Sequence, residues 1–288
     1  MKTIKYFFES LLIYLFFIII KLIGLNNSRK LFPYIFNFIG PLIKSRNTID
    51  INLNTVFPGI NEKEKKKKII EMWSNYAMTF VEYIYLFKFK KNNSHINIKG
   101  KEILKKIIDN NKPVIFVSGH FANFELMSME LVKADINLAI IYRPLNNIFL
   151  NPFMEYLRKK YICPNQIKKG IRGIRNSIEY LNSKYSVALM IDQRVSEGSS
   201  LPFFNTNAAT TTLPAQLAIK YGCEIVPIFI DRKKNNNFQM EIYEPIKFSD
   251  EKNNSDKKIE ITLQLNKIIE KMILKNPGNW IWSHNRWK

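Results

Sequence analysis

The sequence predicts an α/β protein in which a mixed, mostly parallel sheet is flanked by helices and follows an N-terminal membrane-anchor helix. Unbroken apolar runs at residues 114–118, 138–142 and 187–191 alternate with segments of helical spacing. Such runs without polar alternation are typical of parallel strands covered on both faces. Residues 6–25 are almost entirely Phe, Leu, Ile and Tyr. The 288 residues suffice for one sizeable core with a helical appendage.

The N-terminal apolar segment has the length of a membrane anchor. About 20 apolar residues cross a bilayer, so we expect a spanning helix within residues 1–30. The uninterrupted apolar core at 11–20 is shorter, which leaves a tilted or interfacial anchor open. No small-residue cleavage site follows it, and the basic residues that do follow favour a cytoplasmic catalytic domain, although Lys2 and Lys5 precede it. Residues 31–43, with two prolines, predict an interfacial helix or hairpin. Two buried core helices are the alternative.

The remainder divides into a helical, membrane-proximal segment at residues 31–95 and an α/β domain at 96–288. A long helix is expected at 61–88, with an aromatic stripe on one face. The α/β domain begins with a short edge strand at 96–98. Further strands are expected at residues 225–230 and 238–243, and helices at 101–110, 124–134, 152–161, 171–182, 213–221 and 256–275.

The charge of the chain indicates an anionic partner. Lys and Arg number 44 against 24 Asp and Glu, giving a net charge of +20. Nucleic acid, an anionic membrane or an acidic protein would each suit this excess. The chain carries no helix-turn-helix, zinc-binding or RNA-recognition pattern, and the anchor favours the membrane. Cys163 and Cys223 stand far apart, in no metal-ligand spacing, and predict a reduced compartment.

A histidine follows the first buried strand in the position that α/β enzymes use for reactive groups. His120 comes after a Gly-containing turn, and Glu125 lies five residues later. On one continuous helix these side chains would point about 140° apart. With His120 in the turn and Glu125 in the first helical turn, the carboxylate could reach an imidazole nitrogen and leave the other free as a base. The alternative is a hydrogen-bonded structural histidine.

Charged residues also follow the next two predicted strands. Arg143 comes after residues 138–142, and Asp192 and Arg194 come after 187–191. Because the carboxyl ends of parallel strands line one crevice, we expect these groups near His120. Arg143 could bind a phosphate or stabilise an oxyanion, with Asp192 holding it in position. The alternative is a structural Arg–Asp ion pair.

The order of these motifs resembles that of the late acyltransferases of lipid A biosynthesis, the lauroyl and myristoyl acyltransferases with an H-x4-E motif. The resemblance runs from the anchor to the last residue and departs from the pattern at Asn205 and Asn207, where small residues are expected. The matching blocks are Ser118-Gly119-His120-Phe121-Ala122-Asn123-Phe124-Glu125, Tyr142-Arg143-Pro144-Leu145-Asn146-Asn147, Asp192-Gln193-Arg194 with residues 202–212, and residues 277–288.

The resemblance implies an enzyme of the inner membrane, facing the cytoplasm. It would move a fatty acyl chain from acyl carrier protein, or acyl-CoA, to a hydroxyl of a lipid A precursor. His120 would be the general base and Glu125 would orient it, while Arg143 would bind phosphate or the oxyanion. Asp192, Asn123 and Arg194 are further candidate substrate-binding or oxyanion residues. No cofactor, metal or nucleic acid is expected.

The C-terminal block and the identity of the acceptor leave alternatives open. Three basic residues and three tryptophans predict either an interfacial patch or docking of the chain end: His284, Arg286, Lys288, Trp280, Trp282 and Trp287. The same chemistry on a glycerophospholipid, an ornithine lipid or a glycolipid mannoside is the nearest rival function. A nucleic-acid-binding protein and a membrane scaffold with an inactive site are rivals of other classes.

Overall fold

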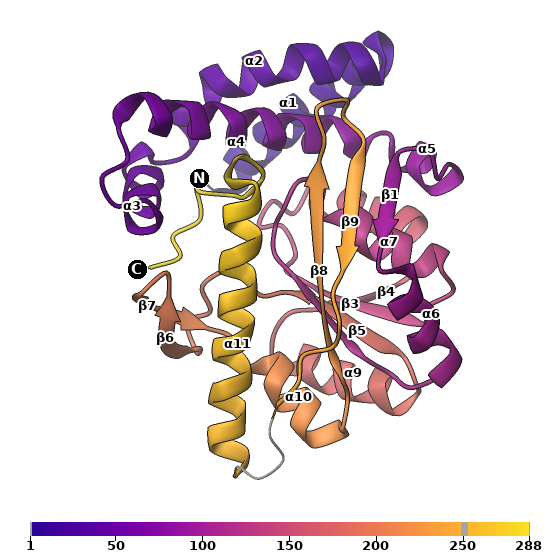
Figure 1. Cartoon of the computed structure of the whole chain (residues 1–288). Helices are drawn as coiled ribbons and strands as arrows, with labels where there is room; N and C mark the ends of the chain where they lie inside the picture. Colours follow the sequence, from indigo (N-terminus) through magenta and orange to yellow (C-terminus); the bar gives the residue numbers. More distant parts are fainter. Residues whose placement is uncertain (1, 249–252, 288) are drawn as a thin grey trace.

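A computed structural model describes residues 2–248 and 253–287, and a seven-stranded sheet forms their centre (Figure 1). Its strands are β1 (Ile96–Lys99), β2 (Ile115–Ser118), β3 (Leu138–Tyr142), β4 (Asn165–Lys168), β5 (Ser186–Met190), β8 (Ile225–Arg232) and β9 (Phe238–Ile242). The spatial order is β1-β9-β8-β2-β5-β3-β4. Strands β8, β2, β5, β3 and β4 are parallel, and β9 and β1 run the opposite way. The predicted mixed, mostly parallel sheet is confirmed.

Helices cover both faces of this sheet. They are α1 (Lys2–Ile23), α2 (Leu25–Ile43), α3 (Arg46–Val56), α4 (Glu62–Tyr83), α5 (Leu86–Lys91), α6 (Lys101–Asn110), α7 (Glu125–Lys133), α8 (Asn151–Leu157), α9 (Ile171–Asn182), α10 (Leu213–Tyr221) and α11 (Asn254–Lys275). A π-helical turn, η1 (Arg158–Ile162), extends α8, and a 3-10 turn, η2 (Pro277–Asn279), follows α11.

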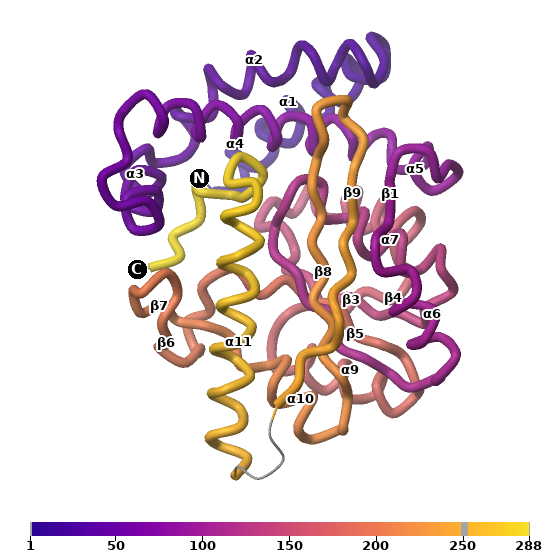
Figure 2. Tube along the Cα trace, viewed as in Figure 1, coloured from indigo at the N-terminus to yellow at the C-terminus, as the bar shows by residue number. Residues whose placement is uncertain are grey.

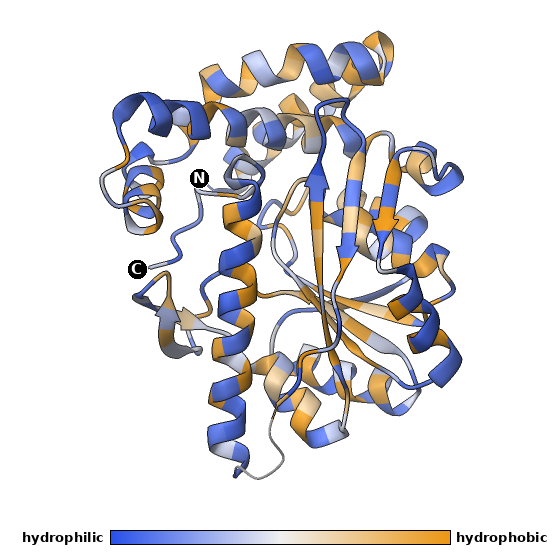
Figure 3. Ribbon diagram, viewed as in Figure 1, coloured by the Kyte–Doolittle hydropathy of each residue, from blue (hydrophilic) through white to orange (hydrophobic). Residues whose placement is uncertain are grey.

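The side chains of alternate residues in the central strand β2 pack into two separate apolar cores. Phe116 packs in the cluster that includes α1, α2 and α4–α8, whereas Ile115 and Val117 pack in the cluster that includes α3, α10 and α11. Strands β2, β3, β5 and β8 are therefore apolar on both faces, as the orange of β8 in Figure 3 illustrates. This double coverage explains why these strands show no polar alternation, whereas β1 and β9 do alternate.

Several predicted elements agree closely with the structure. The helices expected at 101–110, 171–182 and 213–221 are α6, α9 and α10. The helix expected at 61–88 ends earlier, because the N–H of Tyr85 bonds the carbonyl of Glu82 in an i to i+3 turn, and α5 then starts anew. Helix α3 and the polar edge strand β4 were not predicted.

A β-hairpin follows β5, in a segment for which no strand was predicted. Strands β6 (Ser199–Phe203) and β7 (Thr206–Thr210) pair antiparallel around Phe204 and Asn205, whose φ angles are 50° and 60°. Two central residues with positive φ form the turn type that matches strand twist. Because Phe occupies the first of these positions instead of Gly or Asn, the usual sequence signal of the turn is missing.

The N-terminal helices and the C-terminal segment lie at the same end of the sheet. Figure 2 traces the indigo N-terminal helices α1 to α4 along this end, and the yellow C-terminal segment returns beside α3. Asn52 of α3 donates from its amide nitrogen to the carbonyls of Trp282 (2.7 Å) and His284 (2.6 Å). Among the described residues, α1 is the one helix long and apolar enough to cross a membrane, judged by length and composition.

Candidate active site

His120 and Asp192 meet at the carboxyl ends of two neighbouring parallel strands. Ser118 of β2 is in register with Met190 of β5, so residues two positions beyond each strand end face one another. Nδ1 of His120 lies 2.8 Å from Oδ1 of Asp192, and the backbone N–H of His120 donates to Oδ2 at 3.0 Å. Gly119 leaves room for this approach, since a Cβ there would lie 3.1 Å from the Cβ of Asp192 and 2.7 Å from the Phe121 ring.

The surroundings of Asp192 keep its carboxylate charged. Burial would raise its pKa, but the imidazole and backbone N–H of His120 and the indole of Trp280 together lower the pKa to about 2. The indole N–H of Trp280 donates to Oδ2 at 2.8 Å. A charged acceptor against Nδ1 favours the tautomer with its proton on that nitrogen.

Nε2 of His120 is then the basic nitrogen, and it is open to a substrate. The His120 side chain is 21% exposed, and within the described part of the chain no group bonds Nε2. The ring also packs edge-on against Phe124, with centroids 4.7 Å apart. An oriented imidazole with one free nitrogen can accept a proton from a hydroxyl.

The turn after His120 is strained and held from two sides. Ala122 has a φ of 45°, a conformation that side-chain-bearing residues rarely adopt. Its N–H donates to the carbonyl of Asn279 at 2.9 Å, and its carbonyl accepts from the Thr79 hydroxyl at 3.1 Å. Helix α4 and the C-terminal segment therefore fix the backbone that presents the histidine.

Glu125 does not lie against His120 as the sequence suggested. It is the first residue of α7, and its Oε1 accepts from Arg158, 2.8 Å from Nε and 2.6 Å from Nη2, and from the Tyr83 hydroxyl. The helix turns this carboxylate toward α4 and η1, away from the strand ends. Burial would lower the pKa of Arg158, but Glu125 and Tyr83 outweigh it and raise the pKa. The carboxylate at the imidazole comes from Asp192.

Asn123 belongs to a buried charge network behind the turn. Its Nδ2 donates to Glu82 at 2.9 Å, and Glu82 also accepts from Arg29 of α2 and from Arg232 at the end of β8. Burial would raise the pKa of Glu82, but the two guanidinium groups lower it. The network ties α2, α4, β8 and the histidine turn together. Asn123 thus holds the turn in place.

Arg143 and Arg194 are exposed, and neither is paired with Asp192. Both oxygens of Asp192 are taken by His120 and Trp280, and within residues 2–248 and 253–287 no side-chain hydrogen bond or ion pair engages either guanidinium. The predicted Arg143–Asp192 pair is therefore absent from the described structure. The backbone N–H of Arg194 donates to Nε2 of His284 at 3.0 Å.

The C-terminal block docks into the protein and does not form an interfacial patch. Trp280, Trp282 and Arg286 are buried, and Arg286 donates to the Ala209 carbonyl at 3.1 Å. Burial lowers the pKa of Arg286 to about 10. Burial is also the main cause that lowers the pKa of His284 to about 4, so His284 is neutral at pH 7. Of the residues predicted here, Lys288 lies outside the described residues.

Sequence reasoning missed the partners of Asp192, Glu125 and Asn123. Trp280 bonds Asp192, Tyr83 and Arg158 bond Glu125, and Glu82 bonds Asn123. Only Trp280 was indicated beforehand, by the resemblance of the C-terminal block. Within residues 2–248 and 253–287, no group of three or more His, Cys, Asp or Glu side chains could hold a metal ion. That the reaction needs no metal stays a prediction.

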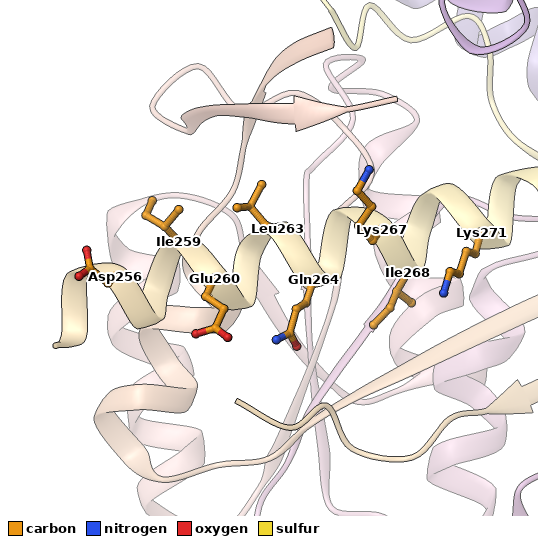
Figure 4. Close-up of a pocket in the computed structure, with 8 residues that line it drawn as sticks. All are labelled: Asp256, Ile259, Glu260, Leu263, Gln264, Lys267, Ile268 and Lys271. Atoms are coloured by element: carbon orange, nitrogen blue, oxygen red, sulfur yellow. The ribbon is translucent and has the colours of Figure 1, made fainter. Parts of the chain in front are cut away.

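An open pocket along α11 is separate from this site. Figure 4 shows its lining residues, which all belong to that one helix: Asp256, Ile259, Glu260, Leu263, Gln264, Lys267, Ile268 and Lys271. No strand-end residue contributes to it. The pocket is therefore distinct from the His120–Asp192 pair at the carboxyl ends of β2 and β5.

Comparison with known proteins identifies the family of the chain. The family model for bacterial lipid A biosynthesis acyltransferases matches residues 1–288. The lipid A biosynthesis palmitoleoyltransferase of Escherichia coli K12 is 27% identical over 256 residues, which cover 86% of this chain and 80% of that protein. The lipid A biosynthesis lauroyltransferase of the same organism is 23% identical over 242 residues, 82% of this chain and 77% of its own. The chain belongs to the bacterial lipid A biosynthesis acyltransferase family.

Proposed function

We propose that this acyltransferase moves a fatty acyl chain from the thioester of acyl carrier protein to a hydroxyl of a lipid A precursor, with His120 as general base. The observation that carries the proposal is the His120–Asp192 pair, with Nδ1 held by a buried carboxylate and Nε2 free. This differs from the sequence-based assignment, in which Glu125 oriented the histidine.

In the proposed reaction Nε2 of His120 takes the proton of the acceptor hydroxyl as its oxygen attacks the thioester carbonyl. The charge on Asp192 stabilises the imidazolium that forms. Collapse of the tetrahedral intermediate forms the new ester and expels the carrier's sulfur, which receives the proton from the imidazolium. The acceptor oxygen is itself the nucleophile, so the protein need not become acylated.

Arg143 and Arg194 are the proposed contacts to anionic groups. Both follow strands at the carboxyl edge of the sheet, and both have unengaged guanidinium groups among the described residues. Guanidinium groups bind phosphate and carboxylate bidentately, which suits the phosphates of the acceptor or the acidic surface of a carrier protein. The net charge of +20 favours the same partners and an anionic membrane. We place the enzyme at the cytoplasmic face of the inner membrane.

The test is acyl transfer by the purified protein to a panel of acceptors. Acyl carrier protein thioesters and acyl-CoA are offered with a lipid A precursor, a glycerophospholipid, an ornithine lipid and a glycolipid mannoside. The expected product is a lipid A precursor with one added acyl chain, formed from the carrier-protein thioester and lost in His120→Gln. Acylation of another lipid alone would refute the lipid A precursor as the acceptor. A fully active His120→Gln variant would refute His120 as the general base.

Mass spectrometry of cellular lipid A checks the same proposal in vivo. Cells without the protein are expected to lack one secondary acyl group, and His120→Gln is expected not to restore it. Asp109→Asn, an exposed change on α6, is the matched control and is expected to restore it. Unchanged lipid A in cells without the protein would contradict the proposal.

A further inference from the structure

We infer that α1 does not span the bilayer, but lies with α2 in a single leaflet, beside a loop of the active-site edge. The exposed apolar faces of α1 and α2 would contact a lipid monolayer with anionic head groups. The inference concerns how the protein sits in the membrane and does not depend on the proposed donor or acceptor.

The first argument is that the catalytic domain holds α1 at both of its ends. Near its start, Nδ2 of Asn147 donates to the carbonyl of Tyr6 at 2.8 Å. Near its end, the Tyr85 hydroxyl donates to the carbonyl of Ile20 at 3.0 Å. At 1.5 Å per residue these contacts stand roughly 21 Å apart along the helix. A spanning helix needs about 30 Å of hydrocarbon around it, with the domain at one end only.

The contacts between these ends lie along one face. The Tyr14 hydroxyl donates to the carbonyl of Phe149 at 2.9 Å, and its ring packs on Phe153. Phe17 stacks on Phe80 of α4 with ring centroids 4.9 Å apart. Residues 6, 10, 13, 14, 17 and 20 thus form the protein-facing side at helical spacing. Helix α1 is packed along its length instead of extending away from the domain.

The opposite faces of both helices are exposed and apolar. Of the 25 large apolar side chains exposed on the described residues, 13 belong to α1 and α2. On α1 they include Leu11, Leu15 and Leu22, and on α2 Tyr34 and Phe38 are each 78% exposed. In Figure 3, orange segments alternate with blue ones along α2. Apolar stripes of this extent mark an interaction surface rather than ordinary solvent-facing helices.

The turn between the helices leaves no room for α2 to lie apart from the domain. Gly24, with a φ of 84°, is the single residue between α1 and α2. Five residues later Arg29 is buried in its ion pair with Glu82. Helix α2 packs along α4 from there. Both helices are therefore fixed to the same body, with their apolar stripes unpartnered.

Charge identifies lipid as the partner. Exposed lysines flank the apolar stripes: Lys2 and Lys5 precede them, Lys21 and Lys30 border the turn, and Lys44 follows α2. Apolar faces rimmed by lysine suit a leaflet with anionic head groups, where each basic residue adds about 1 kcal/mol. A second copy of this chain would bring the same positive rim and repel it.

The loop after β3 extends this surface toward the active site. Leu145, Ile148 and Phe149 are exposed, and the Phe149 ring packs on Phe7 of α1 with centroids 5.6 Å apart. The loop begins at Arg143, two residues before Leu145. The carboxyl edge of the sheet therefore opens at the level of the lipid head groups.

Single-cysteine labelling tests the topology without measuring activity. Both native cysteines are buried, so Lys5→Cys or Asn26→Cys supplies the accessible thiol. In sealed, inverted inner-membrane vesicles, an impermeant maleimide is expected to label both variants without detergent, as it labels Asp109→Cys on the domain surface. Labelling of Lys5→Cys only after detergent would mean a spanning helix and would overturn the inference.

Fluorescence depth measurements test the loop. A polarity-sensitive fluorophore on Ile148→Cys is expected to be quenched by spin-labelled lipid in vesicles containing phosphatidylglycerol. The same fluorophore on Ile108→Cys, an exposed isoleucine of α6, is the matched control and is expected to stay unquenched. Equal quenching at both positions, or at neither, would overturn the inference. Cross-linking of Phe38→Cys into dimers at every lipid-to-protein ratio would instead assign the surface to a second copy.

Discussion

Replacing Asp192 by asparagine tests whether this carboxylate sets the tautomer of His120. Two N–H groups, from the His120 backbone and the Trp280 indole, donate to Oδ2 at 3.0 and 2.8 Å. In the variant the amide oxygen takes this position, because an NH2 group there would leave both donors unsatisfied at about 1–3 kcal/mol each. The amide nitrogen then faces Nδ1 of His120.

This orientation removes the base without removing the histidine. An amide N–H that donates to Nδ1 requires that nitrogen to be unprotonated, so the proton moves to Nε2 and blocks proton abstraction. The equivalent change in a serine protease lowers kcat by about 10⁴, or roughly 5.5 kcal/mol of transition-state stabilisation. We expect a loss on the order of 10³ to 10⁴ in kcat for Asp192→Asn.

The assay is single-turnover acyl transfer with saturating donor, with circular dichroism to confirm folding. Asp109→Asn, an exposed change on α6, is the matched control and should keep full activity. A folded Asp192→Asn enzyme within about tenfold of the wild-type kcat would refute the assignment of Asp192 as the orienting carboxylate.

Three further predictions concern the groups behind the pair. Glu82→Gln leaves the guanidinium groups of Arg29 and Arg232 buried without their anion, so we expect about 3–5 kcal/mol of lost unfolding free energy in a denaturant titration. The exposed change Glu179→Gln is its control and should cost nothing measurable. Trp280→Phe removes one hydrogen bond to a charged oxygen and should lower kcat roughly tenfold with KM unchanged; a change in KM alone would contradict a positioning role. Folding lowers the pKa of Asp192 from 3.8 to about 2. Its carboxylate therefore contributes roughly 2 kcal/mol to the free energy of unfolding above pH 4, and this contribution is lost as the pH falls to 2. In the same denaturant titration, Asp192→Asn should lack this acid-sensitive contribution.

The sequence allowed most of the fold to be predicted, because helices α6, α9 and α10 and the buried strands have strong periodicity of their own. The site was harder, because its key pair depends on strand order. β5 lies between β2 and β3, which places Asp192 beside His120 and leaves Arg143 one strand further away. Nothing local specifies that order.

The predicted contact between Glu125 and His120 was wrong, because it rested on their proximity in the sequence. Glu125 is near His120 in sequence, but the first turn of α7 directs it to Arg158. For the C-terminal tryptophans the sequence allowed either a surface patch or a docked chain end, and the burial of Trp280 shows that this segment is docked. His120 and Asp192 each lie two residues beyond the paired residues Ser118 and Met190, and this is recognisable only once the strand pairing is known.

The docked C-terminus also has a consequence for the order of events during synthesis. His120 leaves the ribosome 160 residues before Trp280, which completes the hydrogen bonds of Asp192. At 5–20 residues per second, roughly 8 to 32 s separate the two. The N-terminal helices can reach the membrane during that interval, whereas the hydrogen bonds around Asp192 are complete only after Trp280 has been made. The helices that face the membrane can thus be in place before the His120–Asp192 pair is fully supported.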